Sequence, residues 1–246
     1  MQILPDETSL LRLLQLADSA LPVGGSAHSY GLETLAQEGS LAPENLEDFL
    51  GDYLEETGAL DAAFVRRAWK RGDLRALSAE YGARKPARES REASLKLGRR
   101  LAGLVNAVFS APVFEPGPTG DAFGGRTLVR AGLESRSGSE AEASRGLKPA
   151  LHAALHYCIV FGAVGALFGA SQDATALGFL HQSIAGLVSA CQRLMPLGQS
   201  AAARILWNLK PAIVHAARCE EVWCFSPYPE LASMRHGSLG TRLFIS

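Results

Sequence analysis

Apolar residues recur at the spacing of an α-helix through most of this chain, and no segment alternates polar and apolar side chains as a strand would. The clearest example is at residues 46–54, where apolar side chains fall at i, i+3, i+4, i+7 and i+8. Hydrophobic residues make up 47% of the sequence and aromatic residues only 7%, so helices can pack closely through Ala and Leu. The sequence therefore predicts an all-α fold, a single-domain bundle of about ten helices over residues 1–246.

Two segments interrupt this helical pattern. Residues 111–147 contain several prolines and glycines and a polar, Ser- and Glu-rich stretch, so we expect a long irregular loop there. Residues 226–246 also lack a helical period, and we expect an irregular C-terminal tail. Between them, the apolar run at 157–170 is shorter than the about 20 residues that cross a bilayer, and it predicts a buried helix.

The charge balance gives no sign of a polyanionic partner. The formal net charge is −1 at pH 7, and the basic residues between positions 84 and 100 are interrupted by acidic and apolar side chains, which is typical of a solvated helix face. We therefore expect neither nucleic acid nor a membrane surface as a partner. The sequence begins without the basic and apolar regions of a signal peptide, so we expect a cytoplasmic protein.

A turn rich in small residues, ALPVGGSAHSYGLE at 20–33, lies between two predicted helices. It lacks the preceding strand and the lysine that a phosphate-binding loop requires. His28 lies beside Ser26 and Ser29, but the sequence shows no carboxylate or oxyanion hole that would complete a catalytic site. We therefore predict no catalytic residue and interpret the stretch as a sharp turn between helices.

Two loose groups of potential metal ligands lie in the second half of the chain. His152 and His156 have the spacing of two ligands on one helix. His215, Cys219 and Cys224 form the other group, whose spacing matches no closed zinc site. Since core or surface roles explain these residues more simply, we predict no metal site. A helical metal-binding protein or metalloenzyme that uses these five residues is the alternative.

The predicted tail combines guanidinium groups with apolar side chains. Arginine with aromatic and aliphatic neighbours is typical of protein-binding segments, although a frayed chain end has the same composition. On the first interpretation, the residues that bind a partner protein are Ser233, Met234, Arg235, His236, Arg242, Leu243, Phe244 and Ser246.

Four stretches, taken in order, resemble the family of the urease accessory protein UreF. They are LLQLADSALPVGGSAHSYGLE, LHYCIVFGAVGALFG, VSACQRLMPLGQSAAARIL and ASMRHGSLGTRLFIS. Ser26 and Gly237 depart from the family pattern, which has an aromatic and an acidic residue at these places. In the first three stretches the matching motif residues are Pro22, Gly24, Gly25, His28, Ser29, Gly31, Glu33, His156, Gly162, Arg193, Pro196, Gly198 and Gln199.

The resemblance implies an all-α homodimer with no enzymatic activity and no cofactor of its own. It implies assembly with UreD, also called UreH, with the GTPase UreG and with the urease apoprotein, in which GTP hydrolysis is coupled to nickel delivery. The tail would then bind UreD/UreH, and the turn at 20–33 would present His28, Ser29 and Glu33 to a partner or to a nickel path. On this hypothesis, Glu33→Ala leaves thermal stability nearly unchanged.

Overall fold

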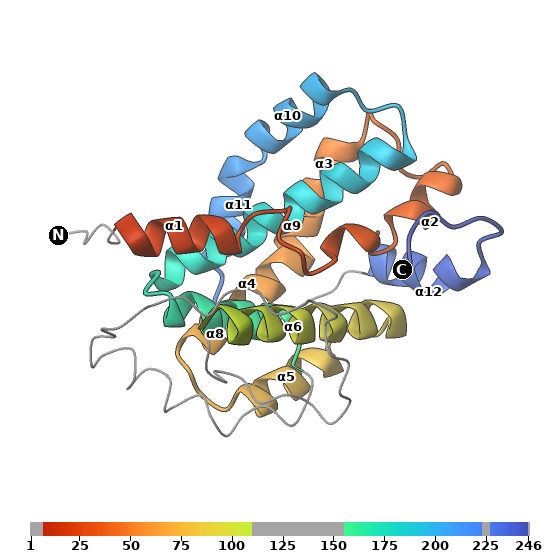
Figure 1. Cartoon of the computed structure of the whole chain (residues 1–246). Coiled ribbons are helices and arrows are strands. Elements are labelled where there is room, and N and C mark those ends of the chain that lie inside the picture. The colour runs from red at the N-terminus through yellow and green to blue at the C-terminus, as the bar shows by residue number, and fades with distance from the viewer. Residues whose placement is uncertain (1–6, 110–154, 223–226, 246) are drawn as a thin grey trace, which may run out of the picture.

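The computed structural model describes residues 7–109, 155–222 and 227–245, and within these ranges the chain forms helices and turns without a strand (Figure 1). The all-α prediction is therefore confirmed, while the loop expected at 111–147 lies outside the described residues. The helices are α1 (Glu7–Leu16), α2 (Leu32–Gln37), α3 (Leu46–Tyr53), α4 (Ala59–Trp69), α5 (Leu74–Ala83), α6 (Arg88–Phe109), α8 (Tyr157–Leu167), α9 (Gln172–Leu194), α10 (Gln199–Asn208), α11 (Lys210–Ala217) and α12 (Pro227–Arg235).

Helix α8 lies in the core, packed against α4, α6 and α9. Its sequence is apolar on nearly every face, and residues 158–165 are all buried. A Cβ atom on Gly162 would lie against the carbonyl oxygen of Val65 in α4, so only glycine lets the two backbones approach this closely. The apolar run at 157–170 is therefore a buried helix, as predicted.

The apolar stripe predicted at 46–54 also faces the core. Leu46, Leu50 and Leu54 are at most 1% exposed. Helix α3 continues into α4 through a π-helical turn at Leu54–Gly58, so residues 46–69 form one long helical rod. The spacing of the leucines predicts the first part of this rod, residues 46–54, because that part is set by local periodicity; the continuation into α4 was not predicted.

Among the described residues, α9 is the one helix long and apolar enough to cross a membrane by length and composition. Half of its most apolar window is buried inside the protein. It contacts α1, α2, α4, α8, α10 and α11, and such burial is typical of a core helix.

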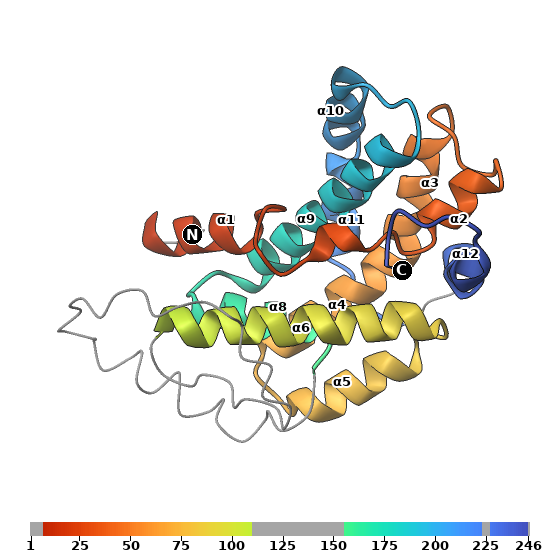
Figure 2. The same ribbon diagram turned by 45° about the vertical axis from the view of Figure 1, so that its right-hand side comes forward.

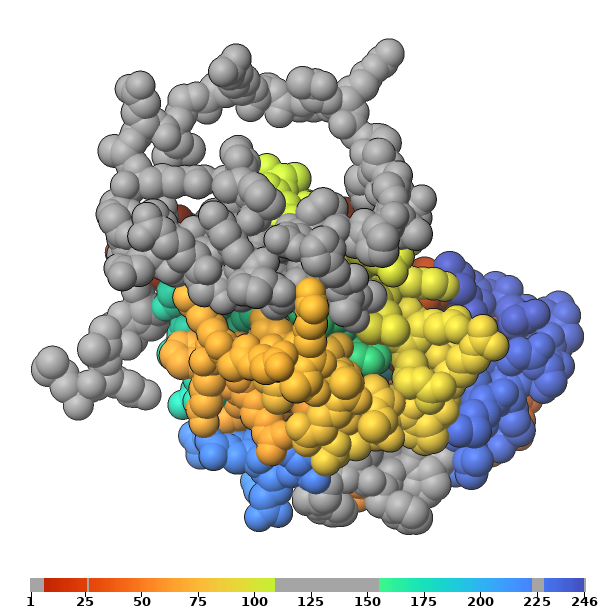
Figure 3. Space-filling view, turned by 90° about the horizontal axis from the view of Figure 1, so that it is seen from below, coloured from red at the N-terminus to blue at the C-terminus, as the bar shows by residue number. Residues whose placement is uncertain are grey.

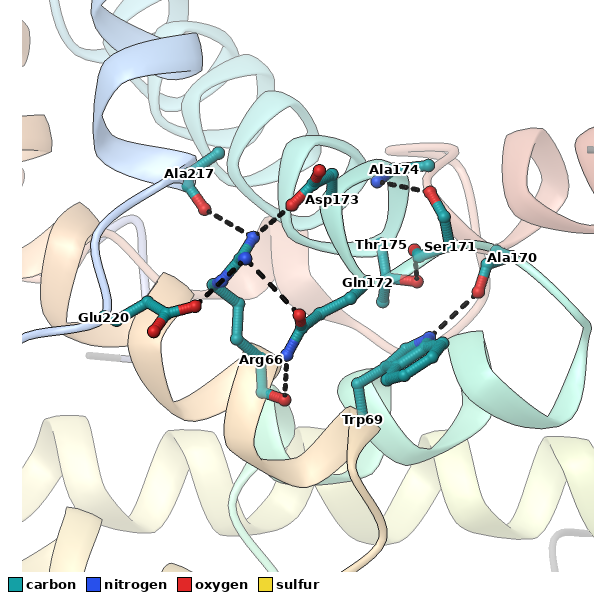
Figure 4. A network of polar contacts seen from close by, with 10 residues as sticks. All are labelled: Arg66, Trp69, Ala170, Ser171, Gln172, Asp173, Ala174, Thr175, Ala217 and Glu220. Carbon is teal, nitrogen blue, oxygen red and sulfur yellow. Dashed lines mark hydrogen bonds and ion pairs between the residues drawn. The ribbon is translucent and has the colours of Figure 1, made fainter. Parts of the chain in front are cut away.

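An arginine in α4 fixes the start of α9 and the end of α11 (Figure 4). The guanidinium group of Arg66 pairs with Asp173 and Glu220 and donates a hydrogen bond to the carbonyl of Ala217. The Gln172 side chain in turn donates to the Arg66 carbonyl at 2.9 Å. The Arg66 side chain is 12% exposed whereas its carboxylate partners are 71% and 65% exposed, so these contacts join α4, α9 and the end of α11 at the protein surface.

The prediction of an irregular C-terminal tail is wrong for most of its length. Helix α12 is followed by a 3-10 turn at His236–Ser238, and the chain then runs back over α2 (Figure 2). The helical pattern of α12 is hard to recognise in the sequence because of Pro227 and Pro229. Both prolines lie in the first turn of α12, where a helix tolerates them. We call residues 227–245 the C-terminal segment; it lies beside the N-terminal half of α6 (Figure 3).

Candidate functional site

Three of the sequence motifs meet at the end of the molecule opposite α1 (Figure 1). They are the turn at 20–33, Arg193 near the end of α9, and the C-terminal segment. The backbone N–H of Ile245 donates a hydrogen bond to the carbonyl of Ala27 at 2.9 Å. The guanidinium carbon of Arg193 lies 4.2 Å from the centre of the Phe244 ring, a cation–π contact. Motifs that are far apart in the sequence thus build one structure.

A buried carboxylate in α2 anchors the C-terminal segment. Glu33 is fully buried and accepts hydrogen bonds from the backbone N–H groups of Leu243, at 2.6 Å, and Phe244, at 3.2 Å. The Nε2 atom of His236 lies 2.8 Å from Oε2 of Glu33, the oxygen that also accepts from Phe244. Desolvation opposes ionisation, but the donors from Leu243, His236 and Phe244 prevail and lower the pKa of Glu33. Glu33 is therefore a charged group, and the hydrogen-bond partners of its carboxylate in the described part of the chain come from the C-terminal segment.

His28, Ser29 and Glu33, which the turn was expected to present to a partner or to a nickel path, do not lie on the surface of this chain. His28 is 5% exposed, and Ser29 and Glu33 are fully buried. Burial, together with the nearby charges of Lys96 and Arg100, lowers the pKa of His28 to about 4, so its ring is neutral at pH 7. In the same turn Pro22 is exposed, and Gly24 and Gly25 are half-buried.

Gly31 explains why the turn and α12 come so close. Its φ of 90° lies in the left-handed region that favours glycine. A Cβ atom there would lie 2.6 Å from the carbonyl oxygen of Pro229 and 3.0 Å from the backbone nitrogen of Ser233. Ser233 itself is buried and shares a hydrogen bond of 2.9 Å with Ser90 of α6. Gly31 therefore allows both the backbone conformation of the turn and the close packing of α12 against it.

The C-terminal segment has a buried inner face and an exposed outer face. Of the predicted partner-binding residues, Ser233, His236 and Phe244 point inward, Met234, Arg235, Arg242 and Leu243 are exposed, and Ser246 lies outside the described residues. We call the exposed large apolar side chains of this segment the outer apolar face; they are Tyr228 (49% exposed), Leu231 (49%), Met234 (49%), Leu243 (72%) and Ile245 (65%).

Polar contacts at the rim reinforce the attachment to α2. Arg235 forms two hydrogen bonds with the carboxylate of Glu38, at 3.0 and 2.8 Å. The Gln37 side chain donates to the carbonyl of Thr241 at 3.0 Å. Because both contacts are exposed, each stabilises the segment less than the buried contacts of Glu33.

A cavity of about 180 Å³ lies behind α12, lined by the turn at 20–33, including His28 and Tyr30, by α12 itself and by residues of α4, α5, α6, α8 and α9. Near α12 its lining is charged: the Tyr81 hydroxyl donates to Asp61 at 2.7 Å, and the ammonium of Lys85 lies 3.6 Å from Asp61 and 4.0 Å from Glu230. Lys85 thus occupies the place between the two carboxylates that a bound cation would need. The charges that line the cavity on this side are therefore paired with one another within the protein.

The two groups of potential metal ligands do not form a site in the described part of the chain. There, no three His, Cys, Asp or Glu side chains gather as metal ligands. His156 is buried at the start of α8, against the Tyr81 ring, and burial with the charges of Lys85 and Arg91 lowers its pKa to about 4. His215 lies in α11 and Cys219 just after it, whereas His152 and Cys224 lie outside the described residues.

The other motif residues that were predicted to be structural lie where α9 passes into α10. Gly198 is the N-cap residue of α10, with an extended backbone, and Gln199 begins the helix. Pro196, Gly198 and Gln199 are exposed in the connection between the two helices.

The sequence did not reveal that α6 contacts α12, the start of α8 and the turn at 20–33. Its basic residues suggested a solvated face, but Ser90 contacts α12, the Ser94 hydroxyl accepts from the Tyr157 backbone N–H, and Arg100 donates to the carbonyl of Val23. Ser90, Ser94 and Leu97 lie four and three residues apart and all line the cavity. This spacing of small and apolar residues within the basic run was the available signal.

Comparison with known proteins places the chain in a family. The family model described as UreF matches residues 41–210. The chain is 30% identical to the urease accessory protein UreF of Paenarthrobacter aurescens (strain TC1), over 97% of this chain and 99% of that protein. It is 33% identical to the protein of the same name from Mycobacterium sp. (strain JLS), over 97% and 100% of the two chains. A third, from Azoarcus sp. (strain BH72), is 32% identical, over 96% and 95%.

Proposed function

This chain belongs to the UreF family of urease accessory proteins, and we propose that it serves the maturation of the urease nickel centre as a non-enzymatic scaffold. In this proposal it joins UreD/UreH to the GTPase UreG on the urease apoprotein and couples GTP hydrolysis to nickel delivery. It does so in the cytoplasm, as a homodimer and without a cofactor of its own.

The outer apolar face is the observation that carries the scaffold proposal. Its five large side chains lie at 49% to 72% exposure on a segment whose other face is fixed by a buried carboxylate. Exposed apolar side chains on an ordered segment are typical of protein-binding surfaces, because they are buried on association with little loss of conformational entropy. We assign this face to UreD/UreH.

Surface substitutions test this assignment better than removal of the C-terminal segment. Truncation would strip the buried Glu33 of its donors and so disturb the fold. The double variant Leu231→Asp/Met234→Asp changes only exposed side chains. We expect its affinity for UreD/UreH to fall at least about 30-fold, as for loss of a binding hot spot, with an unchanged unfolding curve.

The matched control is Leu11→Asp, an equally drastic change at an exposed leucine (66%) of α1, at the other end of the molecule (Figure 1). We expect this variant to bind UreD/UreH like the unmodified chain. Co-purification of UreD/UreH with the double variant at full yield would refute the assignment of the outer apolar face.

A further inference from the structure

Two neighbouring parts of the fold carry charges of opposite sign. Residues 13–65 contain ten Asp and Glu and no Lys or Arg, whereas residues 174–219 contain four Lys and Arg and no Asp or Glu. The first range includes α3, and the second includes α10 and α11. These helices adjoin, because the Asn208 side chain at the end of α10 donates to the Glu47 carboxylate in α3 at 3.1 Å, and α11 packs against the π-helical turn after α3. Opposite charges therefore lie side by side on one part of the molecule.

The exposed charges of these helices form two surfaces. We call the exposed carboxylates in and beside α3 the acidic surface; they are Glu44, Asp48, Asp52 and Glu55. We call the exposed cations of α10 and α11 the basic surface; they are Arg204, Lys210 and Arg218. Within the described ranges, no member of either surface forms an ion pair. Both surfaces can therefore pair with charges on another molecule.

An exposed tryptophan lies in the basic surface, next to its border with α3. Trp207 is 69% exposed and precedes Asn208, the residue that contacts α3. The ammonium of Lys210 lies 3.6 Å from the centre of the Trp207 ring, a cation–π contact that restrains the ring on this face. Val214, one turn further along α11, is also exposed (37%). Tryptophan is among the residues most enriched where binding energy concentrates, so an apolar centre accompanies the paired charges.

We propose that this face binds a second copy of this chain, with the acidic surface of each protomer on the basic surface of its partner. A two-fold axis brings one patch against the same patch in the reverse direction. Adjoining surfaces of opposite charge then meet with complementary signs twice, and Trp207 lies near the axis in both protomers. A partner of a single charge sign would be repelled by one surface, whereas a second copy carries both signs.

This inference rests on the homodimer of the proposed function and names its interface. It uses no residue of the outer apolar face, which we assign to UreD/UreH. Figures 1 and 2 show α10 and the C-terminal segment on different sides of the molecule. A dimer through α3, α10 and α11 therefore leaves the assigned UreD/UreH surface out of the contact.

Charge reversal of each surface tests the proposal. Arg204→Glu/Lys210→Glu reverses the sign of the basic surface, and Asp48→Lys/Asp52→Lys/Glu55→Lys reverses that of the acidic surface; all five side chains are exposed. In either variant alone, like charges oppose each other in both halves of the dimer. Sedimentation equilibrium of the isolated chain should therefore show the dissociation constant of the dimer raised at least about 30-fold. Trp207→Ala should raise it at least about tenfold.

An equimolar mixture of the two charge-reversed variants is the decisive measurement. One variant then carries two acidic surfaces and the other two basic ones, so every contact in the heterodimer again joins opposite charges. We expect a heterodimer whose dissociation constant lies within about tenfold of that of the unmodified dimer. Such recovery requires both variants to be folded. The matched control is Lys96→Glu/Arg99→Glu, two exposed cations of α6 across the molecule from α10, which should leave the dimer unchanged (Figure 1).

The outcomes separate this interface from the homodimer itself. An unmodified chain that sediments as a monomer would contradict both the homodimer of the proposed function and the interface. An unmodified dimer that tolerates the charge reversals would leave the homodimer standing and overturn the interface. Failure of the mixture to form a heterodimer would overturn it as well.

Discussion

Replacing Glu33 with alanine is expected to lower the free energy of unfolding by about 3–5 kcal/mol, because a buried carboxylate with three hydrogen-bond partners is removed and those partners lose their acceptor. The substitution leaves His236 and the N–H groups of Leu243 and Phe244 buried without their acceptor. Urea unfolding monitored by circular dichroism measures the change. The prediction reverses the sequence-based expectation that stability would be nearly unchanged.

The effect of Glu33→Ala should also depend on pH with a definite sign. Because the pKa of Glu33 is lowered in the folded chain, its stabilisation is fully present above the ordinary glutamate pKa of about 4.3 and is lost as the pH falls through the folded value. The unmodified chain and the variant should therefore converge in stability at low pH. Glu38→Ala, a matched control in an exposed pair with Arg235, should cost at most about 1 kcal/mol. Equal losses in the two variants would contradict the anchoring role of Glu33.

Gly31→Ala is expected to displace α12 from α2. An alanine at a φ of 90° is strained by about 1–2 kcal/mol, and its Cβ would collide with the backbone of Pro229 and Ser233. We expect a total loss of about 2–4 kcal/mol in the free energy of unfolding, with strain and overpacking as its two sources. Amide exchange in α12 should rise as the hydrogen bond between Ser233 and Ser90 is lost.

The control for this change lies in the same turn. A Cβ atom on Gly25 would meet no atom of a more distant residue within 4 Å, so Gly25→Ala should change stability by less than about 1 kcal/mol. Faster exchange in α12 for both variants would mean that the turn as a whole, rather than the approach of α12 to Gly31, holds the helix.

The elements predicted well from the sequence are those set by local periodicity. The stripe at Leu46, Leu50 and Leu54 and the apolar run of α8 were both placed correctly, because burial repeats every three or four residues. Helix α12 was missed because Pro227 and Pro229 resemble chain breaks when the packing surface is unknown. That surface is formed by α2 and α6, which no local pattern around α12 reveals.

The residues of the candidate site could be predicted from the sequence, but which of them are buried and what they contact could not. The motifs containing Glu33 and His236 were found, yet a glutamate in a short polar helix looks like a surface charge. Its three partners lie more than 200 residues away in the sequence. Arg193 likewise looks in the sequence like an exposed residue at the end of a helix, whereas in the structure its guanidinium group contacts the Phe244 ring. Such long-range pairing depends on tertiary packing, which propensity and periodicity do not encode.

We expect residues 236–245 to be folded onto α2 before any partner binds. Backbone order parameters from nitrogen-15 relaxation of the isolated chain at pH 6 test it most directly. We predict order parameters of about 0.85 for Leu243 and Phe244, equal to those of α4, as expected of a rigid backbone. Values below about 0.6, typical of a flexible chain end, would contradict the claim.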